Sequence, residues 1–393
     1  MNLFKAYAQY QPHFPNFSFT VILKRKISLQ KATIMRKQSL EFRKEETTFV
    51  MRRWLADESC SLVGVGSVGK SNLLHHISSP EVQKHYMPAI ADRVKTITLD
   101  SNMLGPLEDS VSFRAWAGYE LIMHRLYMAF YPFDVLGDDA QNFYSAYQEL
   151  QDGTNPLYAY MGLRYLEQGI EFFTRRGWKI IFLFDEFEEF FNLMPVNFFQ
   201  SLRGLRDSRK QSIAYLTFSR EPLPVLIDKM NLSRTKLEPF VELFTGNEYF
   251  VGPYNTQDRL DMLNNLIKRH QVQPNSELTE FMLSASGGFA GLLRASFHAL
   301  STIPEVNHVP ISPHDILTKL VQRSAVREEC QTLWNGLTPE EQHVLLAVIE
   351  RETYHDELQP ALELLIRKRL LRKETNGIVV EPPILRYYLH HRY

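Results

Sequence analysis

An eight-residue stretch that begins at Gly64 has the residue types and spacing of a phosphate-binding loop. It fits the pattern G-x-x-x-x-G-K-[ST] at every fixed position. Gly64, Gly66 and Gly69 lack side chains, so the backbone N–H groups can approach a polyphosphate closely. Lys70 would reach the β and γ phosphates, and the Ser71 hydroxyl would bind Mg²⁺. The candidate nucleotide-binding residues are Gly64, Val65, Gly66, Ser67, Val68, Gly69, Lys70, Ser71 and Asn72.

The residues on either side of this loop predict the elements that it needs. Residues 61–63 have the composition of the end of a buried strand, and residues 71–77 predict a helix. A phosphate in the loop would then lie at the positive N-terminus of that helix. The alternative is a glycine turn that matches by chance, and the flanking strand and helix favour the nucleotide site.

Two carboxylates directly follow the apolar run 180–184. An acidic residue at the end of a neighbouring strand can hold Mg²⁺, and we assign this role to Asp185. Glu186 would orient or deprotonate the attacking water. The alternative is that acidic residues here cap the next helix, an explanation that fits Glu188 and Glu189 well.

A further strand, 213–218, is followed by Ser219 and Arg220. A cation at this position would point at the terminal phosphate and stabilise the charge that develops on phosphoryl transfer. We therefore predict that Arg220 senses the γ-phosphate, although a surface arginine after a strand is common.

Strands alternate with helices up to residue 254, and the strands are apolar on both faces. This pattern predicts an α/β fold with a parallel sheet sandwiched by helices, whose ligand lies at the carboxyl ends of the strands. The segment 131–152 contains proline, glycine and aspartates and is expected to be a loop or insertion. The predicted strands are 61–63, 94–99, 179–184, 213–218 and 248–251, and the predicted helices between them include 113–130, 157–175 and 196–207.

From residue 255 the pattern is helical, and it ends in a hairpin. Asn376-Gly377 is a strong hairpin signal, and three helices before it, 326–333, 339–350 and 358–371, predict a winged helix. The expected domains are a basic N-terminal extension (1–45), a P-loop ATPase core (46–254), a helical lid (255–323) and a winged-helix domain (324–393).

Over residues 46–393 the chain resembles the STAND class and its AAA+ relatives among P-loop ATPases. The resemblance rests on the phosphate loop, the Asp185-Glu186 pair, residues 217–220, the helical lid and the terminal winged helix. It implies that Arg220 reads the γ-phosphate. Residues 286–294 look like the lid motif of these relatives, with Ala290 in place of the usual proline. Arg294 stands where AAA+ relatives place a second phosphate sensor, and an arginine on the helix surface is the alternative.

Two arginines on the helix 196–207 are candidates for an arginine finger. In AAA+ assemblies such a residue reaches the nucleotide of a neighbouring subunit. Arg203 and Arg206 are therefore named, with a solvated helical face as the favoured alternative.

The predicted winged helix carries a basic cluster, Arg367, Lys368, Arg369, Arg372 and Lys373. Such a cluster is typical of a duplex-DNA reader. Yet residues 324–393 hold nine basic and eleven acidic residues, whereas DNA readers usually present a basic face. In STAND-like switches the same fold packs on the nucleotide domain, and we favour that intramolecular role.

Composition and charge limit the classes of protein to which the chain can belong. The chain has 393 residues and a net charge of −1, but residues 1–53 hold eleven Lys/Arg and three Glu. A solvated extension is favoured there over a nucleic-acid arm. No apolar run is long enough to span a bilayer, no signal peptide is expected, and two cysteines give no disulfide framework, so a cytoplasmic location is expected.

These observations predict an ATP-binding protein, a slow Mg²⁺-dependent ATPase that acts as a nucleotide-controlled switch. Its expected partners are ATP or ADP, with a protein partner or self-association in the ATP state. The alternatives are a DNA-binding, replication-initiator-like or regulatory ATPase, and a scaffold that binds ATP without turnover.

Overall fold

The computed structural model describes residues 38–105, 107–152, 158–272, 274–301, 312–352, 355–375 and 377–392. Most of the predicted N-terminal extension, the polar stretch 302–311 and Asn376 of the predicted hairpin turn lie outside these residues. Residues 40–393 form one compact unit. The predicted domain boundaries remain predictions.

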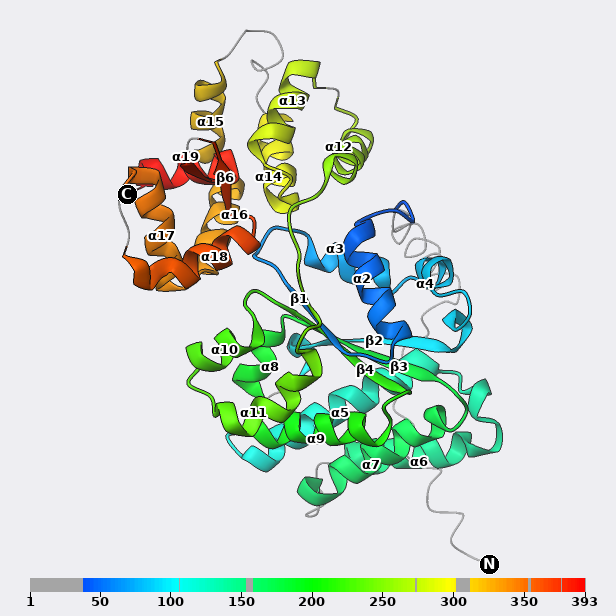
Figure 1. Ribbon diagram of the computed structural model, residues 1–393. Coiled ribbons are helices and arrows are strands. Elements are labelled where there is room, and N and C mark those ends of the chain that lie inside the picture. The colour runs from blue at the N-terminus through cyan, green and yellow to red at the C-terminus, as the bar shows by residue number, and fades with distance from the viewer. Residues whose placement is uncertain are drawn as a thin grey trace, which may run out of the picture. The chain divides into compact units, whose positions relative to one another are not determined.

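A five-stranded parallel sheet forms the centre of this unit (Figure 1). Its order, β2-β3-β4-β1-β5, differs from the sequence-based prediction in one respect. The acidic strand β3 is not the neighbour of β1, because β4 pairs with both and lies between them. All five predicted strands are confirmed within a residue or two: β1 (Cys60–Val63), β2 (Val94–Asp100), β3 (Lys179–Asp185), β4 (Ile213–Ser219) and β5 (Glu248–Phe250).

The central strands are apolar on both faces because each face has its own core. On β3, Ile181 and Leu183 belong to one core, whereas Ile180, Phe182 and Phe184 belong to the other. Alternation along a strand sends successive side chains to opposite faces, so a continuous apolar run requires helices on both sides. The predicted sandwich is therefore present.

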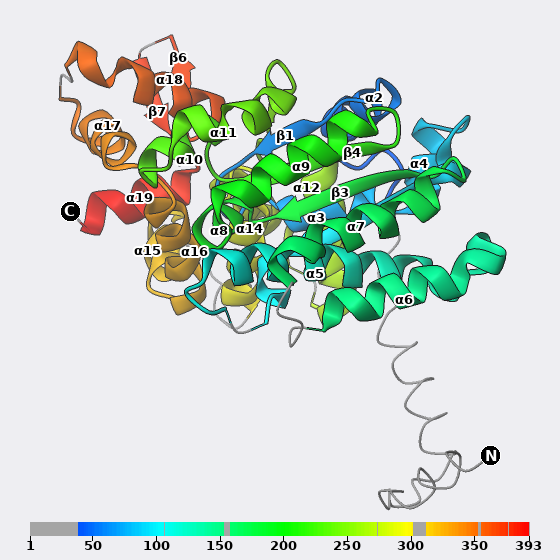
Figure 2. The same cartoon turned by 90° about the horizontal axis from the view of Figure 1, so that it is seen from below.

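Two groups of helices cover the sheet. One face carries α2 (Lys44–Leu55), α3 (Lys70–Ile77) and α4 (Pro80–Tyr86) (Figure 1). The other face, which Figure 2 shows from below, carries the remaining helices of the sheet region. These are α5 (Val111–Phe130), α6 (Ala140–Gln151), α7 (Tyr158–Thr174), α8 (Phe187–Leu193), α9 (Val196–Ser208), α10 (Leu223–Lys229) and α11 (Arg234–Val241).

The segment 131–152 is not a loop, as the prediction had it, because most of it forms α6. Phe143, Ala146, Tyr147 and Leu150 repeat at helical spacing and are buried. The Tyr147 ring stacks on Tyr127 of α5 with centroids 4.5 Å apart. Proline and glycine before the helix obscured this apolar stripe in the sequence.

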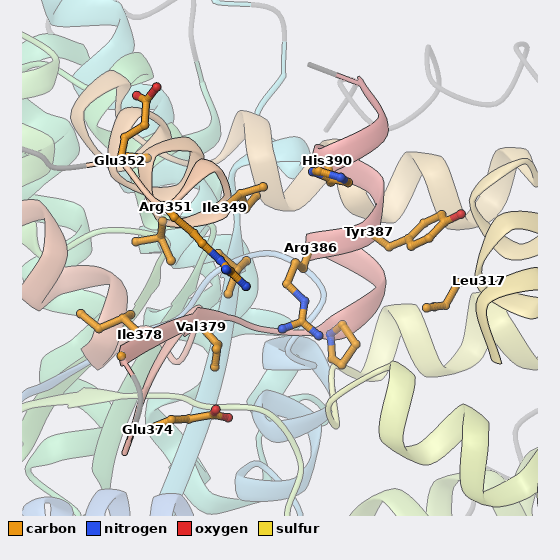
Figure 3. Close-up of a pocket in the computed structure, with 15 residues that line it drawn as sticks. Leu317, Ile349, Arg351, Glu352, Glu374, Ile378, Val379, Arg386, Tyr387 and His390 are labelled. Carbon is orange, nitrogen blue, oxygen red and sulfur yellow. The ribbon is translucent and has the colours of Figure 1, made fainter.

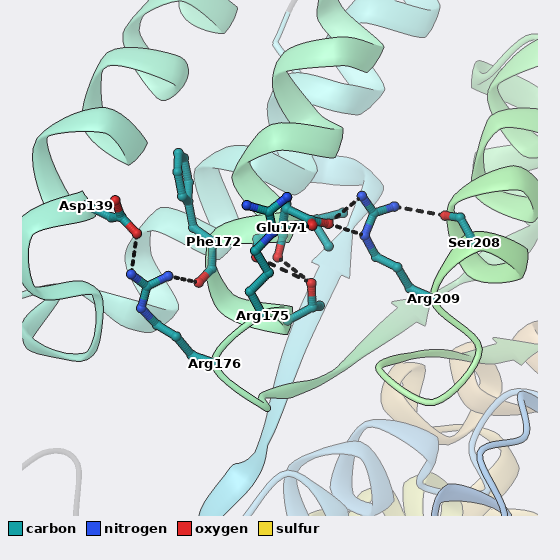
Figure 4. A network of polar contacts seen from close by, with 9 residues as sticks. Asp139, Glu171, Phe172, Arg175, Arg176, Ser208 and Arg209 are labelled. Carbon is teal, nitrogen blue, oxygen red and sulfur yellow. Dashed lines mark hydrogen bonds and ion pairs between the residues drawn. The ribbon is translucent and has the colours of Figure 1, made fainter.

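Ion pairs connect the C-terminal end of α7 with Asp139 before α6 and with Arg209 after α9 (Figure 4). The Glu171 carboxylate of α7 accepts hydrogen bonds from Arg175 on its own helix and from Arg209, which follows α9. These guanidinium groups lower the pKa of Glu171. Arg176 bonds to the Phe172 carbonyl and to the Asp139 carboxylate. The network fixes α7 beside the turn that leads into β4.

The chain after the sheet is helical and ends in a hairpin and one more helix. We use lid for three helices of the predicted lid 255–323, namely α12 (Thr256–His270), α13 (Ser276–Ala285) and α14 (Ala290–Ser301). We use C-terminal unit for α15 (Pro313–Val321), which the prediction also assigns to the lid, together with α16 (Ser324–Asn335), α17 (Pro339–Glu350), α18 (Gln359–Arg367), β6 (Leu371–Glu374), β7 (Gly377–Val380) and α19 (Pro383–Arg392).

The antiparallel hairpin β6–β7 is present where the sequence predicts it. The predicted helix 358–371 is too long, because α18 ends at Arg367 and Leu371 already belongs to β6. The final helix α19 was not predicted. The winged-helix assignment of this unit remains a prediction. Among the described residues, no helix is both long and apolar enough to cross a lipid bilayer.

We expect acid to destabilise the fold through His76 of α3. Its buried ring packs edge-on against Phe42, and burial lowers its pKa to about 4. The unfolded chain takes up the proton near pH 6.5, so stability present above that pH is lost as pH falls toward 4. Between pH 7 and 5 the cost is about 2 kcal/mol. Urea unfolding of the parent and of His76→Leu at both pH values measures it.

The control for this experiment is His75→Gln, which changes the exposed neighbour on the same helix. It should lose as much stability at pH 5 as the parent. If His76→Leu loses the same amount as well, the acid sensitivity has another origin.

Candidate functional site

The carboxyl ends of β1 and β4 meet at one edge of the sheet and are joined by a hydrogen bond. The Gly64 N–H donates to the Ser219 carbonyl over 2.9 Å. The Val251 N–H donates to the Val63 carbonyl over 2.7 Å on the other side of β1. The predicted phosphate loop therefore begins between β4 and β5, at the edge where a ligand lies in open α/β sheets.

The loop has the backbone conformation that an anion-binding concavity needs. Ser67 has φ 67° and Gly69 has φ 90°, both left-handed. A side chain at Gly69 would clash, because its Cβ would lie 2.8 Å from the Tyr254 hydroxyl. Asn72 donates to that same hydroxyl over 2.8 Å. Alternating handedness in successive residues turns N–H groups toward a common centre.

Lys70, the first residue of α3, lies inside the loop. Its ammonium group donates to the carbonyls of Gly64 and Val65. Burial, helped by the nearby Arg220, lowers the pKa of Lys70 to about 8, although Glu188 and Asp185 oppose the shift. Among the residues that the structure describes, no carboxylate lies within ion-pair distance of the Lys70 ammonium.

Three carboxylates, Asp185, Glu186 and Glu188, lie at the carboxyl end of β3 and in the first turn of α8. Asp185 is partly buried, and burial raises its pKa. Glu186 has φ 47° and a half-exposed side chain. Glu188, which the sequence explains as a helix-capping acid, is in the first turn of α8 but is buried, and burial raises its pKa. Its Oε2 atom has no hydrogen-bond partner within the part of the chain that the structure describes. We therefore add Glu188 to the candidate site.

Arg220 lies among these carboxylates. Its Nε is 3.3 Å from Glu188 Oε1, and its Nη2 is 3.9 Å from Glu186 Oε1. The structure thus places Lys70, Arg220 and the acidic end of β3 in one electrostatic cluster, as the sequence predicts.

The lid and the C-terminal unit close on the tip of the loop. At the start of α14, the Gly291 N–H donates to the Ser67 carbonyl, and the Leu292 N–H donates to the Ser67 hydroxyl. A Cβ built on Gly66 would lie 2.8 Å from Thr332 of α16. Residues of both the lid and the C-terminal unit, on α14 and α16, therefore contribute to the surroundings of the loop.

Arg294 of α14, the candidate second sensor, has a different partner. Its side chain is exposed and lies 3.6 Å from the carboxylate of Glu329 on α16. The structure places Arg294 on the lid near the loop, and its role as a phosphate sensor stays a prediction.

Sequence reasoning missed Arg43, which is fully buried next to the loop. Its guanidinium donates to the carbonyls of Val68 and Gly252 and pairs with Glu46. It also lies over the Tyr254 ring, 4.6 Å from the centroid. One arginine in a basic N-terminal segment carries no spacing signal, so the sequence could not have identified it.

The two candidate finger arginines are held within the chain. Arg203 pairs with Asp207 on the next turn of α9. Arg206 donates to the Asp57 carbonyl, which precedes β1 and so lies at the opposite edge of the sheet from the loop. Their assignment as an arginine finger remains a prediction.

Three residues of the predicted basic cluster contact the sheet region, whereas Arg372 lies on β6 and pairs with Glu374 and Glu381. Arg367 bonds to Glu248 over 2.9 Å and lies over the Phe250 ring of β5. Lys368 is buried against Glu221. The stem of Arg369 lies 3.3 Å from the Cβ position of Gly252.

A separate hollow of about 850 Å³ lies in the C-terminal unit. It is bounded by the end of α17, by β7 and by α19, and Arg351 and Arg386 point into it (Figure 3). None of its lining residues belongs to the phosphate loop or to the ends of β3 and β4. It is therefore not part of the cluster around Lys70.

Solved structures support the fold assignment. The Walker-type ATPase PabY2304 of Pyrococcus abyssi is 16% identical, with 88% of this chain and 95% of that chain covered and a TM-score of 0.51. The fold is that of a P-loop NTPase. The ORC2 protein of Aeropyrum pernix (12% identical, 88% and 93% covered, TM-score 0.47) and Cdc6p of Pyrobaculum aerophilum (11%, 91% and 94%, 0.45) are also similar.

No protein family model and no curated protein matches the sequence. At the identities of the structural neighbours, the likeness to this P-loop NTPase fold concerns architecture. The chemistry of the site therefore follows from its own residues and not from these neighbours.

The residues at this site fit a magnesium–nucleotide complex. The partly buried ammonium of Lys70 and the N–H donors of the left-handed loop suit the phosphates, and the partly buried carboxylate of Asp185 suits the metal. Magnesium at nucleotides is held by one or two protein oxygens together with phosphate oxygens, so a dedicated protein cage is not required.

Proposed function

We propose that this protein binds Mg²⁺-ATP at the Gly64–Ser71 loop and hydrolyses it slowly. One observation carries the proposal. Lys70 lies partly buried inside the glycine loop, within one electrostatic cluster with the acidic end of β3 and with Arg220 at the end of β4. A structural ion-pair network has no need of a left-handed N–H loop, and a simple turn has no need of the charges.

Each residue of the candidate site has its own proposed role in phosphoryl transfer. The loop N–H groups and Lys70 bind the β and γ phosphates, and Lys70 exchanges its carbonyl partners for phosphate oxygens. Ser71 and Asp185 would hold Mg²⁺, which neutralises phosphate charge when bound. Glu186 orients or deprotonates water, and Arg220 stabilises charge on the γ-phosphate.

A switch role accompanies this activity, as in the STAND and AAA+ ATPases that the sequence resembles. The Ser67 contacts with α14 and the Gly66 contact with α16 make the loop part of the packing of lid and C-terminal unit. A triphosphate that favours one arrangement of these parts shifts its population by the difference in affinity. Slow turnover suits such a device.

The direct test uses the full chain. Titration calorimetry with ATP and with ADP, in the presence and absence of Mg²⁺, measures binding, and phosphate release measures hydrolysis. We expect micromolar binding that strengthens with Mg²⁺. A protein that binds neither nucleotide contradicts the proposal.

We expect ATP binding to take up a proton above pH 8. The pKa of Lys70 is about 8 in the free protein, and bound phosphates favour its charged form. Binding at pH 9 should therefore absorb about one proton, and affinity should be full below pH 7.5 and fall about tenfold per unit above pH 8. Calorimetry in two buffers with different ionisation enthalpies measures the uptake.

Lys70→Arg is the control, because an arginine stays charged throughout this range. Any binding that it retains should show no proton uptake at pH 9. Equal binding heats for the parent in both buffers would contradict the assignment of Lys70.

A DNA-binding role is the second candidate, and a different set of basic residues favours it. Arg367, Lys368 and Arg369 contact the sheet region, whereas Arg351 and Arg386 point into the hollow of the C-terminal unit. Fluorescence anisotropy of a labelled duplex at low salt tests this role. Binding that weakens steeply with salt and falls in Arg351→Ala/Arg386→Ala would support it.

A further inference from the structure

A buried ion triad joins the C-terminal unit to the end of β4. The Lys368 ammonium, directly after α18, lies 2.5 Å from Glu221 Oε2 and 2.6 Å from Glu341 Oε1. The side-chain exposures of Lys368, Glu221 and Glu341 are 0%, 1% and 1%. A buried ammonium is stable only while it is fully paired, so this contact forms only when the unit is docked.

The carboxylates on the two sides are held firmly. Glu341 also accepts a hydrogen bond from the Thr338 N–H, which makes it part of the capping box of α17. On the sheet side, the Ser219 hydroxyl donates to the Glu221 carbonyl over 2.7 Å, and Pro222 follows and restricts the backbone of Glu221. Lys368 therefore connects two rigid segments.

The sheet-side partner is the residue next to Arg220. Ser219 accepts the hydrogen bond from Gly64 of the phosphate loop, Arg220 faces Glu186 and Glu188, and Glu221 holds Lys368. Three consecutive residues thus contact the loop, the acidic cluster and the C-terminal unit. A shift of Glu221 by an ångström moves the Arg220 backbone by a similar amount.

We propose that Lys368 is a positioning residue for Arg220, so that ATP hydrolysis depends on the docked C-terminal unit. Lys368 touches no substrate atom; it acts by fixing Glu221 and thereby the direction of Arg220. This inference rests on the proposed ATPase activity, in which Arg220 senses the γ-phosphate. It adds that Lys368 controls the position of Arg220.

The experiment is a double-mutant cycle in the full chain. Lys368→Met should lower kcat by roughly ten- to a hundredfold, the size of effect that a small displacement of a catalytic group produces. ADP affinity, measured by calorimetry, should change less than about twofold, because the loop itself is untouched. In an Arg220→Ala background, Lys368→Met should have no further effect on kcat.

Arg367→Met is the matched control. Arg367 is the neighbour of Lys368, and its ion pair is with Glu248 of β5. The substitution therefore removes an ion pair that does not involve the residues after β4. Its kcat should stay close to that of the parent. An equal loss in Arg367→Met, or effects of Lys368→Met and Arg220→Ala that multiply, would show that Lys368 does not act through Arg220.

A variant in which all three residues of the triad are neutral separates the proposed effect from misfolding. Glu221→Gln/Lys368→Met/Glu341→Gln removes all three buried charges together, and such replacements keep the packing without an unpaired ion. This variant should fold, bind ADP and still show the lowered kcat, and a kcat equal to that of the parent overturns the proposal. A parent that hydrolyses no ATP contradicts the proposed function itself, whereas a parent that hydrolyses ATP and an equally active Lys368→Met contradict this inference alone.

Discussion

Replacing Lys70 with alanine should weaken ATP binding by about ten- to a hundredfold and lower hydrolysis at least about a hundredfold. The binding loss is that of hydrogen bonds made by a charged donor, about 1.5–3 kcal/mol. Hydrolysis loses more, because Lys70 is also the cation inside the loop that faces the carboxylates of Asp185, Glu186 and Glu188. Without it, these carboxylates repel the triphosphate. Calorimetry with an ATP analogue and phosphate release measure the two effects.

Lys229→Ala is the control for this substitution. Lys229 is an exposed lysine in the last turn of α10, and the variant should match the parent in both assays. Circular dichroism shows whether Lys70→Ala keeps its fold. A folded Lys70→Ala variant that binds ATP as well as the parent would remove the loop from the proposed site.

Replacing Glu186 with glutamine should lower hydrolysis about a hundred- to a thousandfold while leaving ATP affinity within a fewfold. A glutamine has the shape of glutamate but cannot accept a proton from water, so only the chemical step should suffer. The side chain is half-exposed and can reach solvent and substrate. Single-turnover hydrolysis and calorimetry separate the chemical step from binding.

Glu188→Gln is the informative companion, because Glu188 lies closer to Arg220 and is buried. It should lower hydrolysis by only about tenfold, since its part is to hold Arg220 rather than to accept a proton. If Glu188→Gln abolishes hydrolysis and Glu186→Gln does not, the two roles must be exchanged.

The strand positions could be predicted because each central strand is a short apolar run that is followed by polar or charged residues. Residues 180–186 show this directly, since the run buries on both faces and the acids emerge at the sheet edge. The strand order could not be predicted, because residues on β4 carry no signal that places them between β1 and β3. The prediction that the loop and the acidic pair lie at the same edge of the sheet agrees with the structure, but the prediction that β1 and β3 are neighbours is wrong.

Long-range ion pairs were the other part that the sequence could not supply. Lys368 and Glu221 are 147 positions apart, and neither is unusual for its local helix or loop. The basic cluster around Lys368 is a typical signal of a solvated or DNA-binding helix, and only the packing of α18 shows that it faces the sheet region. Arg43 was missed for the same reason.

The core on the α3 side of the sheet is continuous from Leu62 through Phe289 of the lid region to Leu333 and Leu389 of the C-terminal unit. The three predicted domains after the extension therefore share one apolar interior. Melting should then be a single cooperative transition, and a proteolytic cut in the lid should release no fragment that stays folded alone.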